Sequence, residues 1–454
     1  MRSNCRPAQD VETSEERRRM RILVLSQYWA PENGVPQRRW SWLTKILVEA
    51  GHEVAVIAPP PHYQRQIRLR QWLSKDAIFG CRRAEQGNSG EKILRSGFFP
   101  AGSTLTRRIL NQASVAASML AMQVTHWKQV QEISPDLIIG TVPALPTSVV
   151  TMLVARHLGV PYIVDLRDAW PELLREKDDW NSGTGRRSIR EVVLSKGPFQ
   201  VLTALTEKAM MRALIHANGI ITTSKDLATH LGATLPAKRD GRRRVIRTVR
   251  NVFPAKTKYV AADMSRIDRD ELHVLYAGTV GRAQRIDNAV RAVKIAQDRG
   301  YKVRLRIVGD GAAWLAVRDL IQKTGADATI EHRYPAEGLE EFYDWADTAL
   351  VHLTSWEPLT RTVPSKTYEL MSVGLHISGV VQGEAAALVE KLEAGHVVKP
   401  DDPEALANMW ISLMEDRSKL HVSTGGREWV AKQRDEAVPH VIREIVTSVI
   451  SEKN

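Results

Sequence analysis

The sequence has few residues of the kinds that cross-link a chain or hold a metal ion. Cys5 and Cys81 are its two cysteines among 454 residues, too few for a disulfide framework or a thiolate zinc site. Its 13 histidines form no cluster with the spacing of metal ligands,. We therefore expect no metal ion and no cofactor, and the low cysteine content fits a reducing cytoplasm.

Long apolar runs are also missing. Neither the basic segment 64–75 nor the apolar helix expected over 113–124 contains the ~18–20 apolar residues of a membrane span. Residues 1–19 are polar and rich in arginine near their end, so they cannot serve as a secretory signal. We expect a disordered leader there, with Met20 as an alternative start, and a cytoplasmic protein.

A third absence concerns nucleotide binding. The loop after the first expected strand, residues 31–36, does not contain the G-x-G-x-x-G pattern of dinucleotide-binding folds,. This counts against an NAD-dependent enzyme.

The chain is, by contrast, rich in positive charge. It has 64 lysines and arginines against 52 aspartates and glutamates, a formal net charge of +12. This excess favours anionic partners: nucleic acid, a lipid surface or phosphorylated substrates. A basic run such as 64–75 is also compatible with an ordinary solvated loop.

Strand and helix patterns alternate along most of the chain. Short apolar runs are typical of buried parallel strands, and they occur at 22–26, 53–58, 136–140, 161–165 and 219–223, and again at 272–277, 303–308, 348–353 and 376–381,. The rhythm restarts after Asn251, whereas residues 60–108 are less regular. The length and the restart predict an α/β protein with two doubly wound Rossmann-like domains, 20–250 and 251–430, and a last helix in 431–454.

One loop and helix, residues 362–374, has the features of an anion site. Pro364 suits a first helical turn, Ser365 can cap it or bond back to its backbone, and Gly374 can end the helix in a left-handed turn. The free N–H groups of the helix start and the ammonium of Lys366 suit a phosphate. Glu369 shares a face with Lys366, so an ordinary surface ion pair is an equally good interpretation of this stretch alone.

Other candidates lie where expected strands end, which is where ligands bind in such sheets. Arg167 and Asp168 follow the strand 161–165, although Asp168 also suits a simple turn. Glycines at 278, 281 and 309 let a backbone approach a ligand, and Arg282 can hold a phosphate with two hydrogen bonds.

An ordered series of motifs connects these positions. The series is Asn33-Gly34, Gly51-His-Glu-Val54, Tyr276-Ala-Gly-Thr-Val-Gly-Arg282, Val308-Gly-Asp-Gly311, Pro364-Ser-Lys-x-x-Glu-Leu-Met371, Gly383-Glu-Ala-Ala386 and Pro400-x-Asp-Pro-Glu-Ala-Leu. It resembles the family 4 retaining glycosyltransferases of the GT-B fold, over roughly residues 20 to 440. Within that family it is most similar to bacterial O-antigen and capsule transferases of the fucosamine transferase-like branch.

The resemblance implies roles for individual residues. The first domain would take the acceptor, the second the nucleotide-sugar across a cleft, and the last helix would return to the first domain. Arg282, Lys366 and Glu369 would act in catalysis, Arg282 and Lys366 on the diphosphate and Glu369 on the ribose. The nucleotide-sugar site would comprise Gly34, Thr279, Gly281, Arg282, Gly309, Tyr334, Ser365, Lys366, Glu369 and Glu384. Acceptor-side candidates are Arg38, Arg167 and Asp168.

The sequence departs from the family at one informative position. The first glutamate of the family's E-x7-E element would stand at position 361, which is Arg361. A lysine common after the arginine of the 278–282 loop is replaced by Gln284 and Arg285. These differences bear on the contacts to the donor sugar.

The resemblance implies a hexosyltransferase-type enzyme that moves a sugar from a UDP- or GDP-linked donor to a glycan or lipid-linked acceptor in surface-polysaccharide or glycolipid assembly. Peripheral contact with an anionic membrane is compatible with the basic first half. A non-catalytic nucleotide-sugar binder or a sugar-nucleotide epimerase of the same fold is the alternative. Nucleic-acid binding is not expected, because no aromatic series interleaves the basic run 238–250.

Overall fold

The computed structural model describes most of the chain. The described residues are 19–32, 34–62, 72, 84–100, 105–125, 129, 132–173, 198–238, 241, 244–254, 259–266, 269–334 and 338–451. Nearly all of the expected leader, most of the basic segment 64–75 and most of the polar stretch 178–198 lie outside these residues.

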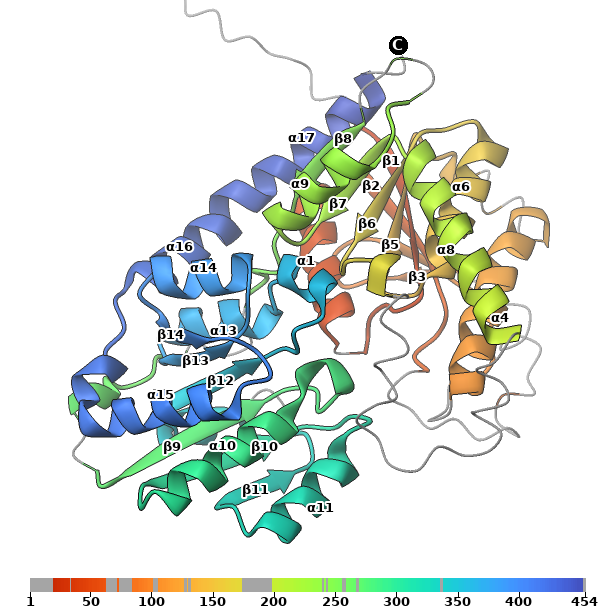
Figure 1. Ribbon diagram of the computed structural model, residues 1–454. Helices are drawn as coiled ribbons and strands as arrows, with labels where there is room; N and C mark the ends of the chain where they lie inside the picture. The colour runs from red at the N-terminus through yellow and green to blue at the C-terminus, as the bar shows by residue number, and fades with distance from the viewer. Residues whose placement is uncertain are drawn as a thin grey trace, which may run out of the picture.

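The structure has two α/β domains, each built on one sheet (Figure 1). The first sheet has the order β3-β4-β2-β1-β5-β6-β7-β8, and all its pairings are parallel except β3 with β4. Its strands are β1 (Arg21–Ser26), β2 (Glu53–Ala58), β3 (Glu85–Gln86), β4 (Lys92–Arg95), β5 (Leu137–Val142), β6 (Tyr162–Leu166), β7 (Gly219–Thr222) and β8 (Val245–Thr248). The central strands β1, β5 and β6 are buried almost throughout, as expected of strands covered on both faces.

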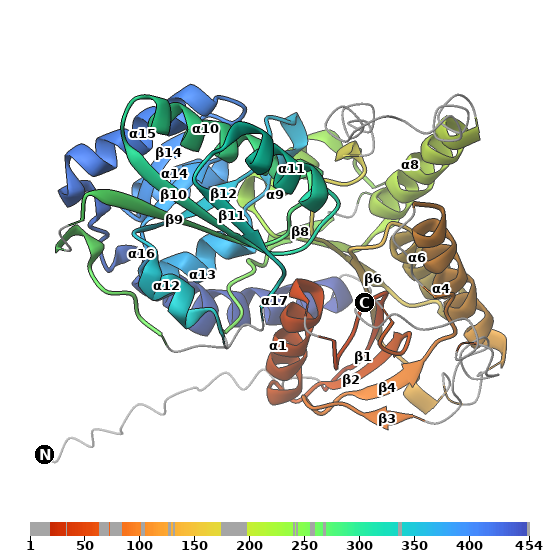
Figure 2. The ribbon, with the colours of Figure 1, turned by 90° about the horizontal axis from the view of Figure 1, so that it is seen from below.

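Helices cover both faces of this sheet (Figure 2). On one face, α6 (Pro146–Leu158) packs on β5 and lies between α4 (Leu105–Thr125) and α8 (Pro198–His216). On the other, α1 (Val35–Glu49) packs with α17 (Val438–Ser451). The helix α17 also contacts β8, and its Ile445 and Val449 lie over Gly219 of β7. The C-terminal helix thus completes the first domain.

The second sheet is entirely parallel, with the order β11-β10-β9-β12-β13-β14. Its strands are β9 (Glu271–Ala277), β10 (Lys302–Val308), β11 (Ala328–Glu331), β12 (Thr348–His352), β13 (Ile377–Val380) and β14 (Gly395–Val398). Its helices are α10 (Ile286–Asp298), α11 (Trp314–Thr324), α12 (Glu340–Trp345), α13 (Ser365–Val373), α14 (Glu384–Lys391), α15 (Pro403–Glu415) and α16 (Gly425–Lys432).

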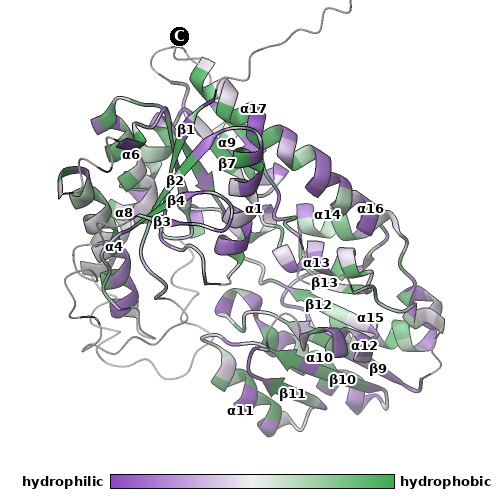
Figure 3. Cartoon of the chain, turned by 180° about the vertical axis from the view of Figure 1, so that it is seen from behind, coloured by the Kyte–Doolittle hydropathy of each residue, from purple (hydrophilic) through white to green (hydrophobic). Residues whose placement is uncertain are grey.

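The apolar core is divided by the second sheet. Side chains of α10, α11 and α15 form one cluster with one face of that sheet. Side chains of α12, α13 and α14 on its other face are continuous with the core of the first domain. Figure 3 shows hydrophobic strands between helices of mixed character. The shared core places α13 on the side of the second domain that meets the first.

Two local expectations were incomplete. The irregular region 60–108 contains β4, which pairs with β2 and extends the first sheet; a four-residue strand leaves little period to detect. Pro364 occupies the N-cap of α13, without a side-chain capping hydrogen bond, and Ser365 takes the first helical position. Ser365 is therefore not the N-cap residue, one of the two roles expected for it, whereas Gly374 ends the helix with φ of 77° as expected.

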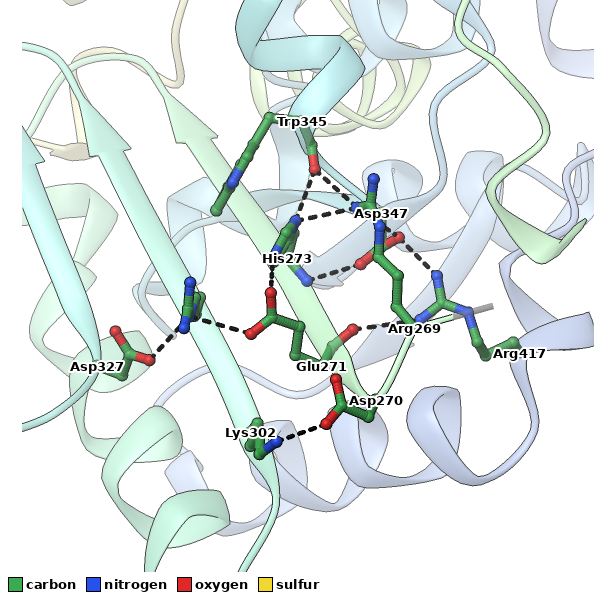
Figure 4. A network of polar contacts seen from close by, with 10 residues as sticks. Arg269, Asp270, Glu271, His273, Lys302, Asp327, Trp345, Asp347 and Arg417 are labelled. Atoms are coloured by element: carbon green, nitrogen blue, oxygen red, sulfur yellow. Dashed lines mark hydrogen bonds and ion pairs between the residues drawn. The ribbon is translucent and has the colours of Figure 1, made fainter. Parts of the chain in front are cut away.

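A charged network links several elements of the second domain at the edge where its strand β9 begins, opposite the edge where the strands end (Figure 4). The buried carboxylate of Asp347 accepts hydrogen bonds from the backbone N–H of His273 at 2.8 Å and from Arg417 at 2.6 Å. Arg269 lies 3.4 Å from the same carboxylate. Because ligands bind at strand C-termini in such sheets, we interpret this network as structural.

Candidate functional site

The helix α13 carries the central pair of the candidate site. The ammonium of Lys366 lies 3.1 Å from one carboxylate oxygen of Glu369, and the hydroxyl of Tyr343 donates to the other at 2.9 Å. Burial by itself would raise the pKa of Glu369, but Lys366 and the Tyr343 hydrogen bond hold it below its ordinary value. Glu369 is therefore an oriented carboxylate, with its charge balanced at the helix start.

The first domain meets this helix through α1. Arg38, on the first turn of α1, donates to the carbonyl of Pro254 at 3.0 Å, and its guanidinium lies 4.6 Å from the ring centre of Phe253. Its charge also lowers the pKa of Glu369. A pocket between the domains is lined by Arg38, Asn251, Val252, Phe253, Ser365, Tyr368, Glu369, Ser372 and Val430. The structure thus brings Arg38, Ser365 and Glu369 together from distant parts of the chain.

The glycine-rich loops of the second domain stand at the same edge as α13. A Cβ on Gly309 would lie 1.7 Å from the carbonyl oxygen of Gly278, so the loops after β9 and β10 touch through their backbones. Arg282 opens the short helix η3 (Arg282–Gln284), and the N–H of Thr354, after β12, donates to Ala283 at 2.9 Å. These contacts place η3 beside the loop that leads to α13.

Thr279, Gly281 and Tyr334 follow strands of the second domain, whereas Gly34 lies at the start of α1 in the first domain. The carbonyl of Thr279 accepts a hydrogen bond from Tyr276 at 2.6 Å, and Gly281 is the extended N-cap of η3. Gly34 is the N-cap of α1 and accepts from the N–H of Arg38 at 3.0 Å. Tyr334 follows the edge strand β11, is 44% exposed, and donates to Glu331 at 3.2 Å. Tyr334 is not among the residues lining the pocket beside Glu369.

A buried ion pair that the sequence did not reveal lies next to Arg38. The side chains of Arg39 and Asp165 are fully buried and 2.8 Å apart. Arg39 also donates to the carbonyl of Val249 at 2.8 Å and to Asn251 at 3.0 Å, while Trp40 donates to Asp165 at 2.8 Å. This pair fastens α1 to the end of β6 and to the segment that joins the domains. A charged residue in a helix carries no sequence signal for such a role.

Arg167 and Asp168, the acceptor-side candidates, follow β6 directly. The carbonyl of Arg167 accepts from the hydroxyl of Thr223 at 2.9 Å, which links the ends of β6 and β7. Burial and the charge of Arg39 lower the pKa of Arg167 to about 10. Burial also raises the pKa of Asp168. Both side chains are therefore charged groups partly withdrawn from solvent at the C-terminal end of β6.

The position that departs from the family, Arg361, bridges the two domains. It ends the short helix η5 (Glu357–Arg361), and its guanidinium donates to Glu357 and to Glu172 of the first domain. Glu172 in turn lies 2.5 Å from the imidazole of His230. The hydroxyl of Ser224 donates to the carbonyl of Arg361 at 2.5 Å. Where a glutamate was expected, the chain thus has a cation held by a carboxylate of the other domain.

Glu384, expected to contact the nucleotide-sugar, takes part in a second interdomain contact. One carboxylate oxygen accepts from Arg250, and the other accepts from the N–H of Asp226 at 3.0 Å. Arg250 also donates to the hydroxyl of Tyr368 at 3.1 Å. Both oxygens of Glu384 are engaged by the first domain, and its contact with a nucleotide-sugar stays a prediction.

Within the described part of the chain, no three or more His, Cys, Asp or Glu side chains are grouped so as to hold a metal ion. In the same part, no helix has the length and apolar character that crossing a bilayer requires.

Comparisons with known proteins cover both domains. Residues 34–248 match the model described as a Glycosyl transferase 4-like domain, and residues 271–416 match that of Glycosyl transferases group 1. An exopolysaccharide phosphotransferase from Streptomyces coelicolor is 30% identical over 139 residues, which is 30% of this chain and 14% of that relative. The aligned region is therefore a small part of the relative.

Solved structures resemble nearly the whole chain. Sucrose-phosphate synthase from Thermosynechococcus elongatus superposes with a TM-score of 0.66 and 17% identity, over 95% of this chain and 100% of that one. HepE from Anabaena, solved with UDP, superposes with a TM-score of 0.58 and 15% identity, over 95% of this chain and 100% of that one. The lipopolysaccharide outer core galactosyltransferase WaaB superposes with a TM-score of 0.53 and 11% identity, over 96% of this chain and 100% of that one. At these identities the likeness shows the fold, and it confirms the expected GT-B architecture.

Proposed function

We propose that this chain, a glycosyltransferase of the GT-B fold by its two matched domains, transfers a sugar from a nucleoside-diphosphate donor to an acceptor hydroxyl with retention at the anomeric carbon. The observation that carries the proposal is that Glu369 of α13 and Arg38 of α1 line one pocket between the domains, while Lys366 lies 3.1 Å from Glu369. This arrangement offers cationic groups and a half-buried carboxylate to one ligand.

The chemistry needs charge stabilisation on the departing diphosphate. Lys366, Arg282 and the free N–H groups at the start of α13 are suited to this task. Glu369, with both oxygens already oriented by Lys366 and Tyr343, is suited to accept hydrogen bonds from ribose hydroxyls. A UDP- or GDP-linked donor fits these groups, and HepE was solved with UDP and with UDP-glucose.

The acceptor is proposed to be a glycan or lipid-linked sugar in surface-polysaccharide or glycolipid assembly, taken at the cytoplasmic face of a membrane. The basic character of the chain supports an anionic surface,. Arg167, Asp168 and Arg38 are the acceptor-side candidates. The fucosamine transferase-like branch remains our proposal on the basis of the motif series.

The test is a donor screen. UDP-, GDP- and ADP-sugars are incubated with the protein and a lipid extract, and donor consumption and nucleotide affinity are measured. We expect one donor to be consumed, and Lys366→Ala to abolish turnover while Lys391→Ala, an exposed lysine of α14 in the same domain, leaves it unchanged.

Other outcomes separate the alternatives. Donor binding without turnover would favour a non-catalytic binder, and conversion of the donor without an acceptor would favour an epimerase. A product of inverted anomeric configuration would refute retention. Absence of binding by every donor would refute the whole proposal.

A further inference from the structure

The outer face of the first domain carries apolar side chains that no other described element covers. The helices α4, α6 and α8 lie side by side there (Figures 1 and 2). Their large exposed apolar residues are Leu110, Val124, Leu153, Val201 and Leu205. A surface helix normally turns polar residues to solvent, so apolar residues on three adjacent helices call for an explanation.

The helix α4 shows the feature most clearly. Its exposed positions include Leu110, Ala113, Ala117, Ala121 and Val124. These positions are three or four residues apart, so they form one stripe along the helix. Its other side, with Val115, Met119 and Met122, is buried in the domain core. The helix is therefore apolar on both its inner and its outer side.

The charged residues of the same face are almost all basic. Within the bounds of α4, α6 and α8 there are five lysines and arginines and one acidic residue: Arg107, Arg108, Arg156, Lys208, Arg212 and Glu207. All five basic residues are exposed. Apolar side chains mixed with cations suit the interface of a bilayer with anionic headgroups. A self-contact between two copies would instead bring these cations together.

The face also has a useful position relative to the cleft. In a parallel sheet each helix returns antiparallel to its strands. The N-terminal halves of α4 and α8, which carry Leu110, Val201 and Leu205, therefore lie toward the edge where the strands end. That is also the edge at which Arg167 and Asp168 follow β6.

We infer that the face formed by α4, α6 and α8 docks the protein on an anionic lipid bilayer, so that the acceptor-side edge of the cleft lies near the membrane surface. The inference rests on the proposed function for the nature of the acceptor, but the docking itself does not depend on catalysis. Membrane binding can therefore be measured without a donor or an acceptor.

The experiment is sedimentation of the full chain with vesicles of phosphatidylcholine, with and without phosphatidylglycerol. We expect binding to the mixed vesicles and little to the neutral ones. Leu205→Asp should reduce binding at least tenfold. Leu315→Asp on α11 of the second domain is the matched control, because both leucines are 60% exposed. The Leu315→Asp variant should bind the mixed vesicles as tightly as the wild type.

A second pair of variants tests the charge. Lys208→Gln with Arg212→Gln should weaken binding about thirtyfold, as expected for two cations at an anionic surface. Arg291→Gln with Lys323→Gln, exposed residues of the second domain, should have little effect. Thermal melting of each variant checks that it folds.

Three results would overturn the inference. The first is that the protein binds neutral and mixed vesicles equally well. The second is that the control variants lose as much binding as the variants of the face. The third is that the wild type binds no vesicles and forms dimers, which Leu205→Asp converts to monomers. If vesicles bind but no donor is consumed in the screen, the docking face stands and the proposed function fails.

Discussion

The buried pair of Arg39 and Asp165 allows a stability prediction of definite size. Replacing Arg39 with Met removes the cation from a site where both side chains are fully buried. Breaking one partner of such a pair costs about 3–5 kcal/mol, because the other charge stays buried without compensation. The carbonyl of Val249 and the amide of Asn251 also lose a donor. We therefore expect Arg39→Met to lower the free energy of unfolding by about 4 kcal/mol.

The double variant isolates the electrostatic part. Asp165→Asn in the Arg39→Met background removes both charges, while the amide oxygen can still accept from Trp40. We expect the double variant to be more stable than the sum of the two single losses predicts, with a coupling of about 2–3 kcal/mol. Urea unfolding, followed by far-ultraviolet circular dichroism and by tryptophan fluorescence, measures these differences.

An exposed ion pair serves as the control. Arg318→Met breaks the pair with Asp319, in which the side chains are 44% and 63% exposed, and should cost less than about 0.5 kcal/mol. If Arg39→Met costs under about 1 kcal/mol, or if the two single losses simply add, the pair is not the uncompensated buried charge that the argument requires.

Two further predictions concern Glu369. The folded state holds the pKa of this carboxyl below its ordinary value, so the stability it contributes is present at neutral pH and is lost as the pH falls through the folded pKa. Lys366→Met removes the group that lowers the pKa of Glu369 most. The loss in melting temperature should therefore be greatest near neutral pH and shrink toward pH ~4. A loss independent of pH would contradict this prediction. Tyr343→Phe keeps the ring but removes the hydrogen bond to Glu369, and should weaken nucleotide binding about tenfold. Tyr259→Phe, which removes a hydrogen bond to Asp344 instead, is its calorimetric control, and equal affinities in the two variants would show that Tyr343 does not position Glu369.

Local patterns in the sequence were sufficient for most of the architecture. Continuous apolar runs predicted the central strands because a parallel strand buried on both faces needs no polar positions. The helix starts at Ser224 and Asp402 follow from side chains that accept the N–H of Leu227 and Ala405, which are local interactions. The left-handed turn at Gly374 is local too,. Such features depend on neighbours within a few residues and can be recognised in one chain.

The candidate site could be predicted only in part from such local patterns. Lys366 and Glu369 could be paired from their spacing on one helix, but the choice between a surface pair and a ligand site could not be made. The structure supplies Arg38 and Tyr343, which lie 331 and 26 positions away from Glu369 in sequence. The Tyr343 hydrogen bond forms within the second domain, between α12 and α13. Arg38 reaches the same pocket because the two domains meet across a shared core.

The interdomain charges illustrate the same limit. Arg361 was recognised as a departure from the family, yet nothing local relates it to Glu172, which lies 189 positions away in the sequence. Sequence alone determined most of the strands, several helix ends and the motif series, because short-range periodicity and capping encode them. Tertiary structure alone decided which charges neutralise one another, because a charge buried between domains is stable only beside the partner that the packed fold brings to it.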